Sequence, residues 1–339
     1  VNPEYEAAKQ ISHMLKYPTA IKVESFFGGK FNILEVIINS NSILNGVSLI
    51  DSKKIIDFPS LVCLVERQGE VFVPRGNYVF NVGDKVHITA ANKNLKKFYK
   101  LLGNQDNMEK KITSSLVIGG GKIAHYLVEF LQIANFYVKV IEIDKNKAIA
   151  LSETFPDIDV IWADGSDRDT LIEEGIQTFD SCISLTGFDE ENIIINLYAD
   201  KLGIKKTVAK VNRASLKQIA EDIGQYSYIT PKEIVGNIIT KYTKSLQCSK
   251  HSDIENFYRI ANNQAEVIEF KITNNSAKIL GIKLKDLAIN PNMLIAFIIR
   301  NNKQIFPNGD DEIKLDDNVV VVSYKHKIEH IDDIISRGQ

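Results

Sequence analysis

An internal repeat places the strongest constraint on the fold: two segments match at a constant separation of 233 residues, as from Arg67 to Arg300. The strand-like run Val62–Arg67 corresponds to Ile295–Arg300, and both runs are followed by a Pro-x-Gly and then an Asp-x-Val sequence. A gapless match over so many positions indicates two copies of one domain. The matching positions are Arg67, Pro74, Gly76, Asp84, Val86, Leu95, Phe98 and Leu102 in the first copy, and Arg300, Pro307, Gly309, Asp317, Val319, Ile328, Ile331 and Ile335 in the second.

Each copy is predicted to be a small α+β domain. Alternating apolar residues predict strands, for example over Phe31–Ile38 and Val86–Thr89. The Pro-x-Gly sequences predict turns, and a short amphipathic helix is expected to close each copy. We therefore place the first small domain at residues 20–106 and the second at residues 255–339.

The segment between the copies, residues 112–230, alternates strand and helix patterns. This alternation predicts a parallel sheet with crossover helices. The expected fold class is therefore α/β: a Rossmann-type parallel-sheet domain flanked by two homologous small α+β domains. Its strands are predicted at Ile112–Ile118, Tyr137–Ile143, Val160–Ile161, Cys182–Leu185 and Val208–Val211.

A helix that begins with proline precedes each small domain. Asn2-Pro3 opens a helix predicted over Tyr5–Tyr17, and Thr230-Pro231 opens one over Ile234–Tyr242. The second helix follows the Rossmann-type segment, and residues 231–254 are interpreted as a crossover helix and linker. By symmetry of the repeat, residues 1–19 are expected to be the crossover helix of a further Rossmann domain that the sequence lacks.

The first predicted strand of the Rossmann domain runs into Gly119-Gly120-Gly121-Lys122-Ile123-Ala124, a G-x-G-x-x-A pattern followed by a helix. The first glycine permits a tight turn, and the third lets the backbone approach a diphosphate. The helix amino terminus then offers free N–H groups and a partial positive charge. Because strand, loop and helix occur in this order, the pattern indicates a nucleotide site rather than a glycine-rich structural turn.

An acidic residue follows at the expected distance. Glu142 lies 23 residues after Gly119, close to the ~20 at which a carboxylate accepts hydrogen bonds from ribose hydroxyls. A carboxylate there repels a 2′-phosphate, so the predicted cofactor is NAD(H), or an adenosine nucleotide such as ATP or ADP, rather than NADP(H). Asp144 is the other candidate ribose ligand, although it also suits the cap of the next helix.

Further polar residues follow the carboxyl ends of the later strands, where open α/β sheets bind ligands. Asp164 is a candidate contact to the ribose or base, or a helix cap near Asp167. Thr186 and Gly187 follow the fourth strand. Arg213 follows the fifth, and either pairs with phosphate oxygens or forms a surface salt bridge with a nearby glutamate.

Composition narrows the classes of function. The net charge of −2 gives no indication of nucleic-acid binding. No apolar run approaches the ~20 residues that span a bilayer. Cys63, Cys182 and Cys248 lie far apart and lack metal-ligand spacing, which is typical of a reduced, cytoplasmic protein. We predict no metal site and no catalytic residues.

The chain resembles the TrkA family, in which Rossmann-type "regulator of potassium conductance" (RCK, or KTN) domains alternate with small carboxy-terminal domains. The resemblance covers essentially all 339 residues. It rests on both small domains and on Gly119–Ala124, Val140–Glu142, Ala163–Gly165, Ser184–Thr186, Asp189–Asn192 and Lys210–Arg213.

The resemblance implies a nucleotide-sensing regulatory subunit on the cytoplasmic face of the inner membrane. Its expected partners are a membrane potassium transporter of the TrkH or TrkG kind and further copies of itself, arranged in a ring. By the same resemblance, Gly119 to Ile123, Glu142, Thr186, Gly187 and Arg213 line the nucleotide site.

Two other classes of function compete with this interpretation. An NAD-dependent oxidoreductase needs a proton-transfer group near the nicotinamide. Tyr198 and Lys201 do not form a Tyr-x-x-x-Lys pair, because Lys201 lies three positions after Tyr198 and the motif requires four. An adaptor protein that has lost its ligand would keep the fold without the binding. Turnover of NADH or an absence of nucleotide binding would favour these alternatives, respectively.

Overall fold

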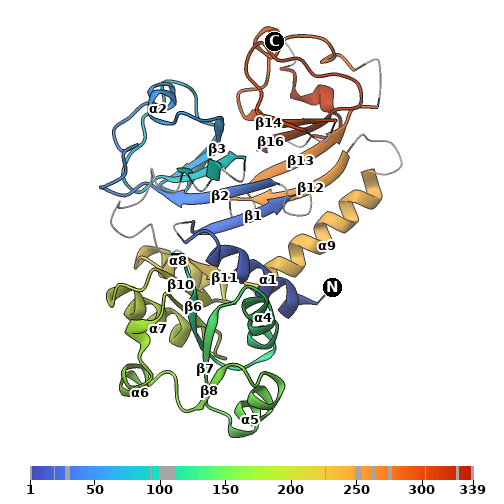
Figure 1. Ribbon diagram of the computed structural model, residues 1–339. Coiled ribbons are helices and arrows are strands. Elements are labelled where there is room, and N and C mark those ends of the chain that lie inside the picture. Colours follow the sequence, from blue (N-terminus) through green and yellow to red (C-terminus); the bar gives the residue numbers. More distant parts are fainter. Residues whose placement is uncertain are drawn as a thin grey trace. The chain divides into compact units, whose positions relative to one another are not determined.

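The protein is described by a computed structural model, in which the chain forms two compact units (Figure 1). One unit combines Val1–Val23 with Asp106–Gly236, and the other combines Glu24–Gln105 with Asn237–Gln339. The structure describes residues 2–18, 20–26, 31–91, 94–95, 97–98, 111–225, 227–248, 254–261, 264–273, 277–301, 303–325 and 328–336.

The first unit contains a six-stranded sheet whose pairings are all parallel. The first strand of this sheet along the chain is a central one. The strands that follow it extend the sheet first on one side and then on the other, which is the order of a Rossmann fold. The predicted fold class is confirmed, although the short sixth strand was not predicted. Across the sheet the strands are β11 (Tyr228–Ile229), β10 (Lys206–Lys210), β9 (Ser181–Ser184), β6 (Ser114–Ile118), β7 (Tyr137–Glu142) and β8 (Asp159–Trp162).

Helices cover both faces of this sheet, because alternate strand residues point to opposite sides. Val117 and Ile183 share one buried core with α4 (Lys122–Ile133), whereas Leu116 and Cys182 share another with α7 (Asp189–Lys201). Figure 1 shows α4 and α5 on one side of the sheet and α7 on the other. The helices of this domain are α4 (Lys122–Ile133), α5 (Lys145–Thr154), α6 (Arg168–Glu173), α7 (Asp189–Lys201) and α8 (Ala214–Asp222), and η2 (Ile176–Thr178) is a short 3₁₀ turn.

Helix α1 (Pro3–Leu15) packs on this same domain. Asn2 caps it by accepting from the Tyr5 N–H at 3.1 Å, as the Asn-Pro signal indicates. Ile11 and Met14 are fully buried in the core that also contains α4, and the Tyr5 ring meets Tyr126 edge to face. The apolar face of α1 is therefore covered by the Rossmann domain rather than by the small domain that directly follows it in the chain.

A buried lysine fastens the segment after α1 to the sheet. Lys206, at the start of β10, donates from Nζ to the Ala20 carbonyl and to the Ser227 hydroxyl, each at 2.7 Å. Burial lowers the pKa of Lys206 to about 7, against the opposing effect of the Asp200 carboxylate. Its two acceptors keep a polar group satisfied in an interior position.

The second unit contains two five-stranded sheets with the same strand order, as the repeat predicts. The first is β1 (Lys22–Phe26), β2 (Phe31–Ile37), β5 (Lys85–Ala90), β3 (Ser60–Arg67) and β4 (Glu70–Phe72), accompanied by α2 (Leu49–Ile55). The second is β12 (Ile254–Ile260), β13 (Ala265–Lys271), β16 (Asn318–Tyr324), β14 (Met293–Arg300) and β15 (Lys303–Ile305), accompanied by the 3₁₀ turn η3 (Leu284–Asp286).

The two copies repeat each other in detail. Arg67 makes a two-armed ion pair with the buried carboxylate of Asp84, and Arg300 does the same with Asp317, all at 2.7–2.8 Å. The second guanidinium arm also donates to a backbone carbonyl in each copy. Both sheets shift register at an equivalent position, Cys63 in β3 and Ala296 in β14. A β-bulge at the same position in both copies is a specific feature of the fold rather than a defect of one sheet.

The copies also share a core. Cys63 and Leu64 pack in one buried cluster with their counterparts Ala296 and Phe297. Equivalent residues that meet in this way form a pseudo-two-fold contact like that of a symmetric dimer. Each small domain therefore completes the core of the other.

The prediction of an amphipathic helix at the end of each copy is wrong for the second copy. There the chain forms one 3₁₀ turn, η4 (Ile331–Ile334), because Ile335 leaves the helical path to pair with Ile289. In the first copy the predicted helix lies largely outside the described residues.

Helix α9 (Pro231–Cys248) begins at the predicted proline but extends beyond the predicted end. The Thr230 hydroxyl, expected to cap this helix, donates instead to the Val211 carbonyl at 2.7 Å. Within the described part of the chain, every helix is too short or too polar to traverse a bilayer.

Candidate functional site

The turn between β6 and α4 is built around Gly119. Its φ of +97° lies in the region that L side chains rarely adopt. A Cβ there would also lie 3.1 Å from the carbonyl carbon and oxygen of Leu185, just beyond β9. The glycine thus permits both the turn and a close approach between the ends of two neighbouring strands.

The amino terminus of α4 is open. Its N-cap is Gly121, so no side chain caps the helix, and its first turn contains no acidic residue. A Cβ built on Gly121 would meet no atom of the described residues within 4 Å. Lys122 is exposed at the first helical position, and Ile123 is buried in the core. An uncapped helix start with open space before it is a fitting place for phosphate oxygens.

Glu142 lies at the end of β7 with only 6% of its surface exposed. One carboxylate oxygen accepts from the Gly120 N–H at 2.5 Å, and the other from the Asp144 N–H at 2.8 Å. A Cβ on Gly120 would lie 3.2 Å from the first of these oxygens. Gly120 therefore leaves room for the Glu142 carboxylate and holds it in place through a hydrogen bond. The Gly120 N–H already has this acceptor before any ligand binds.

Asp144 and Asp164 were each predicted to be either a ligand contact or a helix cap. Asp144 caps α5 by accepting from the N–H groups of Asn146 and Lys147, at 2.9 and 3.2 Å. Asp164 is exposed and accepts from the backbone and hydroxyl of Ser166, while Asp167 caps α6. Glu142 thus remains the carboxylate nearest the glycine loop, and Asp164 stabilises its own turn.

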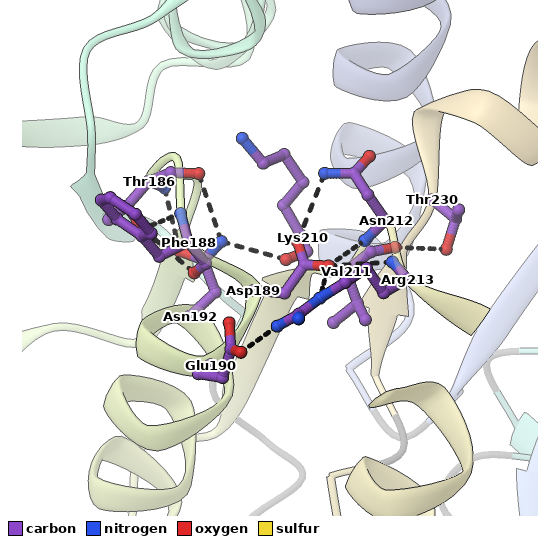
Figure 2. Close-up of polar contacts among 10 residues, drawn as sticks. All are labelled: Thr186, Phe188, Asp189, Glu190, Asn192, Lys210, Val211, Asn212, Arg213 and Thr230. Atoms are coloured by element: carbon purple, nitrogen blue, oxygen red, sulfur yellow. Dashed lines mark hydrogen bonds and ion pairs between the residues drawn. The ribbon is translucent and has the colours of Figure 1, made fainter. Parts of the chain in front are cut away.

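The loop after β9 is held by Asn192, a fully buried residue of α7 (Figure 2). Its side chain accepts from the Thr186 N–H at 2.9 Å and donates to the carbonyls of Thr186 and Lys210, at 3.3 and 3.0 Å. Gly187 lies at the tip, and no atom in the part of the chain that the structure describes lies within 4 Å of an added Cβ. Asn192 thereby joins the ends of β9 and β10 beside the glycine turn, a role that we did not predict.

Arg213 is engaged in ion pairs. Its guanidinium donates to Glu190, and Figure 2 shows the side chain extended toward that carboxylate. Both side chains are 55% exposed, so the pair contributes little to stability. Asp189 accepts from the backbone N–H groups of Asn212 and Arg213, at 2.9 and 2.8 Å. The salt bridge that the sequence left open is therefore present.

Lys210 is a second residue that the sequence analysis missed. It ends β10, and its Nζ donates to the Leu185 carbonyl at 3.3 Å, the same carbonyl that Gly119 approaches. Burial lowers the pKa of Lys210, against the opposing effect of Asp189. An ammonium group thus lies at the carboxyl edge of the sheet beside the glycine turn.

The structure brings the glycine loop, Glu142, Thr186 and Lys210 together at the carboxyl ends of β6, β7, β9 and β10. Asp164 and Arg213 lie farther along the same edge, after β8 and β10. This edge combines the backbone amides at the start of α4, the Lys210 ammonium group and the buried carboxylate of Glu142. Such a set suits an anion linked to a hydroxylated sugar.

Fold and site together define a class: a Rossmann-type domain combined with a repeated pair of small α+β domains. The family model described as TrkA-N domain matches residues 115–231, and the model described as TrkA-C domain matches residues 33–103 and 267–336. The chain therefore belongs to the TrkA family.

The chain is also similar to proteins whose names contain TrkA. The chain is 26% identical over 334 residues to "Trk system potassium uptake protein TrkA homolog" of Archaeoglobus fulgidus, covering 98% of this chain and 72% of that protein. It is 25% identical over 340 residues to "Trk system potassium uptake protein TrkA" of Haemophilus influenzae, with the same two coverages.

Solved structures agree on the fold. The GsuK RCK domain matches with a TM-score of 0.51 and 15% identity, covering 94% of this chain and 67% of that one. The GsuK channel bound to NAD matches with the same score and identity, covering 94% of this chain and 56% of that one. At this identity the likeness concerns the fold alone.

Proposed function

We propose that this protein binds NAD(H), or alternatively ATP or ADP, at the β6–α4 turn and acts as a nucleotide-sensing regulatory subunit of a Trk-type potassium uptake system. The observation that carries the proposal is the uncapped amino end of α4 beside the buried carboxylate of Glu142. The names of the relatives and the NAD bound to the GsuK channel support it.

Each residue has a specific role in the proposed complex. The amides of Gly121, Lys122 and Ile123 hold the diphosphate, and Gly119 gives the backbone its turn. Glu142 accepts from the ribose hydroxyls and disfavours a 2′-phosphate. Its bond to Gly120 orients the carboxylate before the ligand arrives.

The remaining predicted residues lie around this centre. Lys210 supplies positive charge near the diphosphate, while Thr186 and Gly187 form the rim opposite Glu142. Arg213 reaches phosphate oxygens when it exchanges Glu190 for the ligand, a small cost because that ion pair is exposed. Asp164 lies near the base or ribose.

The regulatory role needs two conformations that bind the nucleotide with different affinity. In the proposed complex the protein lies on the cytoplasmic face of the inner membrane, assembles as a ring and contacts a potassium transporter of the TrkH or TrkG kind. No chemical step is proposed, and a test for NADH turnover with carbonyl substrates separates this role from an oxidoreductase.

A thermal-shift panel with NAD, NADH, NADP, ATP and ADP tests the binding. A ligand at about 100 times its Kd adds roughly 2.7 kcal/mol to stability. Glu142→Ala is expected to lose most of that shift. Asp144→Ala is the matched control, because it costs about 1 kcal/mol through the lost cap of α5 but retains the shift. A panel without any shift would reject the proposal.

A further inference from the structure

The only tryptophan of the chain lies at the same edge of the sheet. Trp162 ends β8, and its side chain is 59% exposed. The indole N–H donates to the Ile143 carbonyl at 3.0 Å, and the Lys145 ammonium lies 4.8 Å from the ring centroid. Because the N–H bond fixes the ring while most of its surface faces solvent, the indole is a preformed flat surface.

The position of this ring follows from the strand register. Trp162 pairs with Glu142 between the parallel strands β8 and β7, so both side chains leave the same face of the sheet. Glu142 turns toward the glycine loop, which marks this face as the one that carries the α4 amino terminus. The backbone of Trp162 therefore lies one strand spacing, about 4.8 Å, beyond that of Glu142.

The strand order then matches the order of groups in a nucleotide. β6 leads into the amide-rich turn, β7 ends in the carboxylate, and β8 ends in the aromatic ring. A nucleotide is likewise built as phosphate, ribose and base. A ligand held at the first two positions directs its base toward the third.

We propose that Trp162 stacks on the base of the bound nucleotide and makes the site selective for purine nucleotides over ribosyl phosphates and pyrimidine nucleotides. This inference rests on the proposed function, since it assigns the base to a site whose phosphate and ribose positions were proposed above. Lys145, on one face of the indole, adds a cation to the same wall.

The single tryptophan makes the test direct, because all indole emission of the full chain comes from this site. ADP, UDP and ribose 5-phosphate are titrated against the protein, with emission and calorimetry recorded in parallel. ADP is expected to quench the emission and to bind more tightly than UDP. Trp162→Ala is expected to weaken ADP binding roughly tenfold or more, whereas Trp162→Phe keeps most of the affinity.

Tyr137→Ala is the matched control. Tyr137 is also an exposed aromatic residue that bridges β7 and β8, through its hydroxyl to Asp159 at 2.5 Å, but it lies at the opposite edge of the sheet. The Tyr137→Ala variant should bind ADP with the same affinity as the wild-type protein.

The outcomes separate the two proposals. If ADP binds but leaves the emission and the Trp162→Ala affinity unchanged, the stacking is refuted and the nucleotide site stands. If Trp162→Phe is as weak as Trp162→Ala, the indole N–H rather than stacking is responsible, and the inference fails. If no nucleotide binds the wild type, the site itself is rejected and the inference with it.

Discussion

Gly119 satisfies two conditions that a larger residue cannot satisfy together. Its φ is +97°, and an added Cβ would lie 3.1 Å from the backbone of Leu185. We expect Gly119→Ala to destabilise the protein by about 1–3 kcal/mol and to abolish the nucleotide-induced thermal shift, as measured by urea unfolding and thermal denaturation.

Gly203→Ala is the control for this substitution, since Gly203 has a φ of +84° but no atom within 4 Å of an added Cβ. It should cost about 1 kcal/mol from backbone strain and leave the ligand shift intact. Equal losses in the two variants would show that the contact with Leu185 is unimportant.

Lys206 makes the stability depend on pH above neutrality. Its folded pKa is about 7, below its ordinary value of 10.5, so between these values the unfolded chain holds a proton that the folded protein lacks. The free energy of unfolding therefore rises with pH in this window, by up to about 1.4 kcal/mol per pH unit. Below the window the lysine is protonated in both states and contributes no slope.

We expect Lys206→Met to lose this rise while other alkaline titrations remain. Urea unfolding of both proteins at several pH values between 7 and 10 gives the difference directly. Parallel stability curves would contradict the assignment of a depressed lysine pKa to the buried site.

Local spacing predicts some of these residues and cannot predict others. Gly119 and Glu142 are recognisable because the turn and the strand end lie at fixed distances along the chain. Asn192 and Lys210 act on carbonyls that are brought near only by the parallel pairing of β9 and β10. Their roles depend on the tertiary fold, so no local pattern marks them.

Among the structural elements, the same arginine–aspartate contact recurs in both small domains. Asp317 is fully buried, and Arg300 supplies two of its hydrogen bonds. We expect Arg300→Ala to cost about 3 kcal/mol, because a buried carboxylate loses its partner. The measurement is the urea midpoint of the full chain.

Lys54→Ala provides the comparison, because the Lys54–Asp51 pair is exposed, with 80% and 52% of the two side chains accessible. It should leave the urea midpoint nearly unchanged, because solvent screens an exposed ion pair. If both substitutions lowered the urea midpoint equally, burial of Asp317 would not be the reason that stability depends on Arg300.

The strands with continuous apolar runs could be predicted from the sequence, and the short or capped elements could not. β6, β7 and β10 appear close to their predicted ranges because each contains consecutive buried apolar residues, as expected of strands in a parallel sheet covered on both faces. β11 has only two residues, which is too short for a periodic pattern. The helix predicted near Ile331 was wrong because a strand-like bridge at Ile335 overrides its helical spacing.

At the scale of the whole molecule, the proposed ring requires a surface that joins copies of the chain. The neighbouring helices α7 and α8 expose Ile194, Ile219 and Ile223, at 65%, 52% and 51%. Exposed apolar side chains on neighbouring elements are typical of interaction sites. We expect the protein to self-associate in sedimentation velocity, and Ile219→Glu with Ile223→Glu to shift it toward the monomer.

Ile133→Glu is the matched substitution, because Ile133 is 75% exposed at the end of α4, on the other face of the sheet. It should leave the sedimentation profile unchanged. A wild-type protein that stays monomeric at high concentration would count against the ring.

The core shared by the two small domains has a consequence for synthesis on the ribosome. Ile33, Leu64 and Val71 are translated long before Ala296 and Phe297, which cover them, and the whole Rossmann domain is made in between. At about 5–20 residues per second, the first small domain waits on the order of ten seconds or more with this apolar face exposed to solvent. Nascent chains that stop within this interval should therefore need a chaperone to stay soluble.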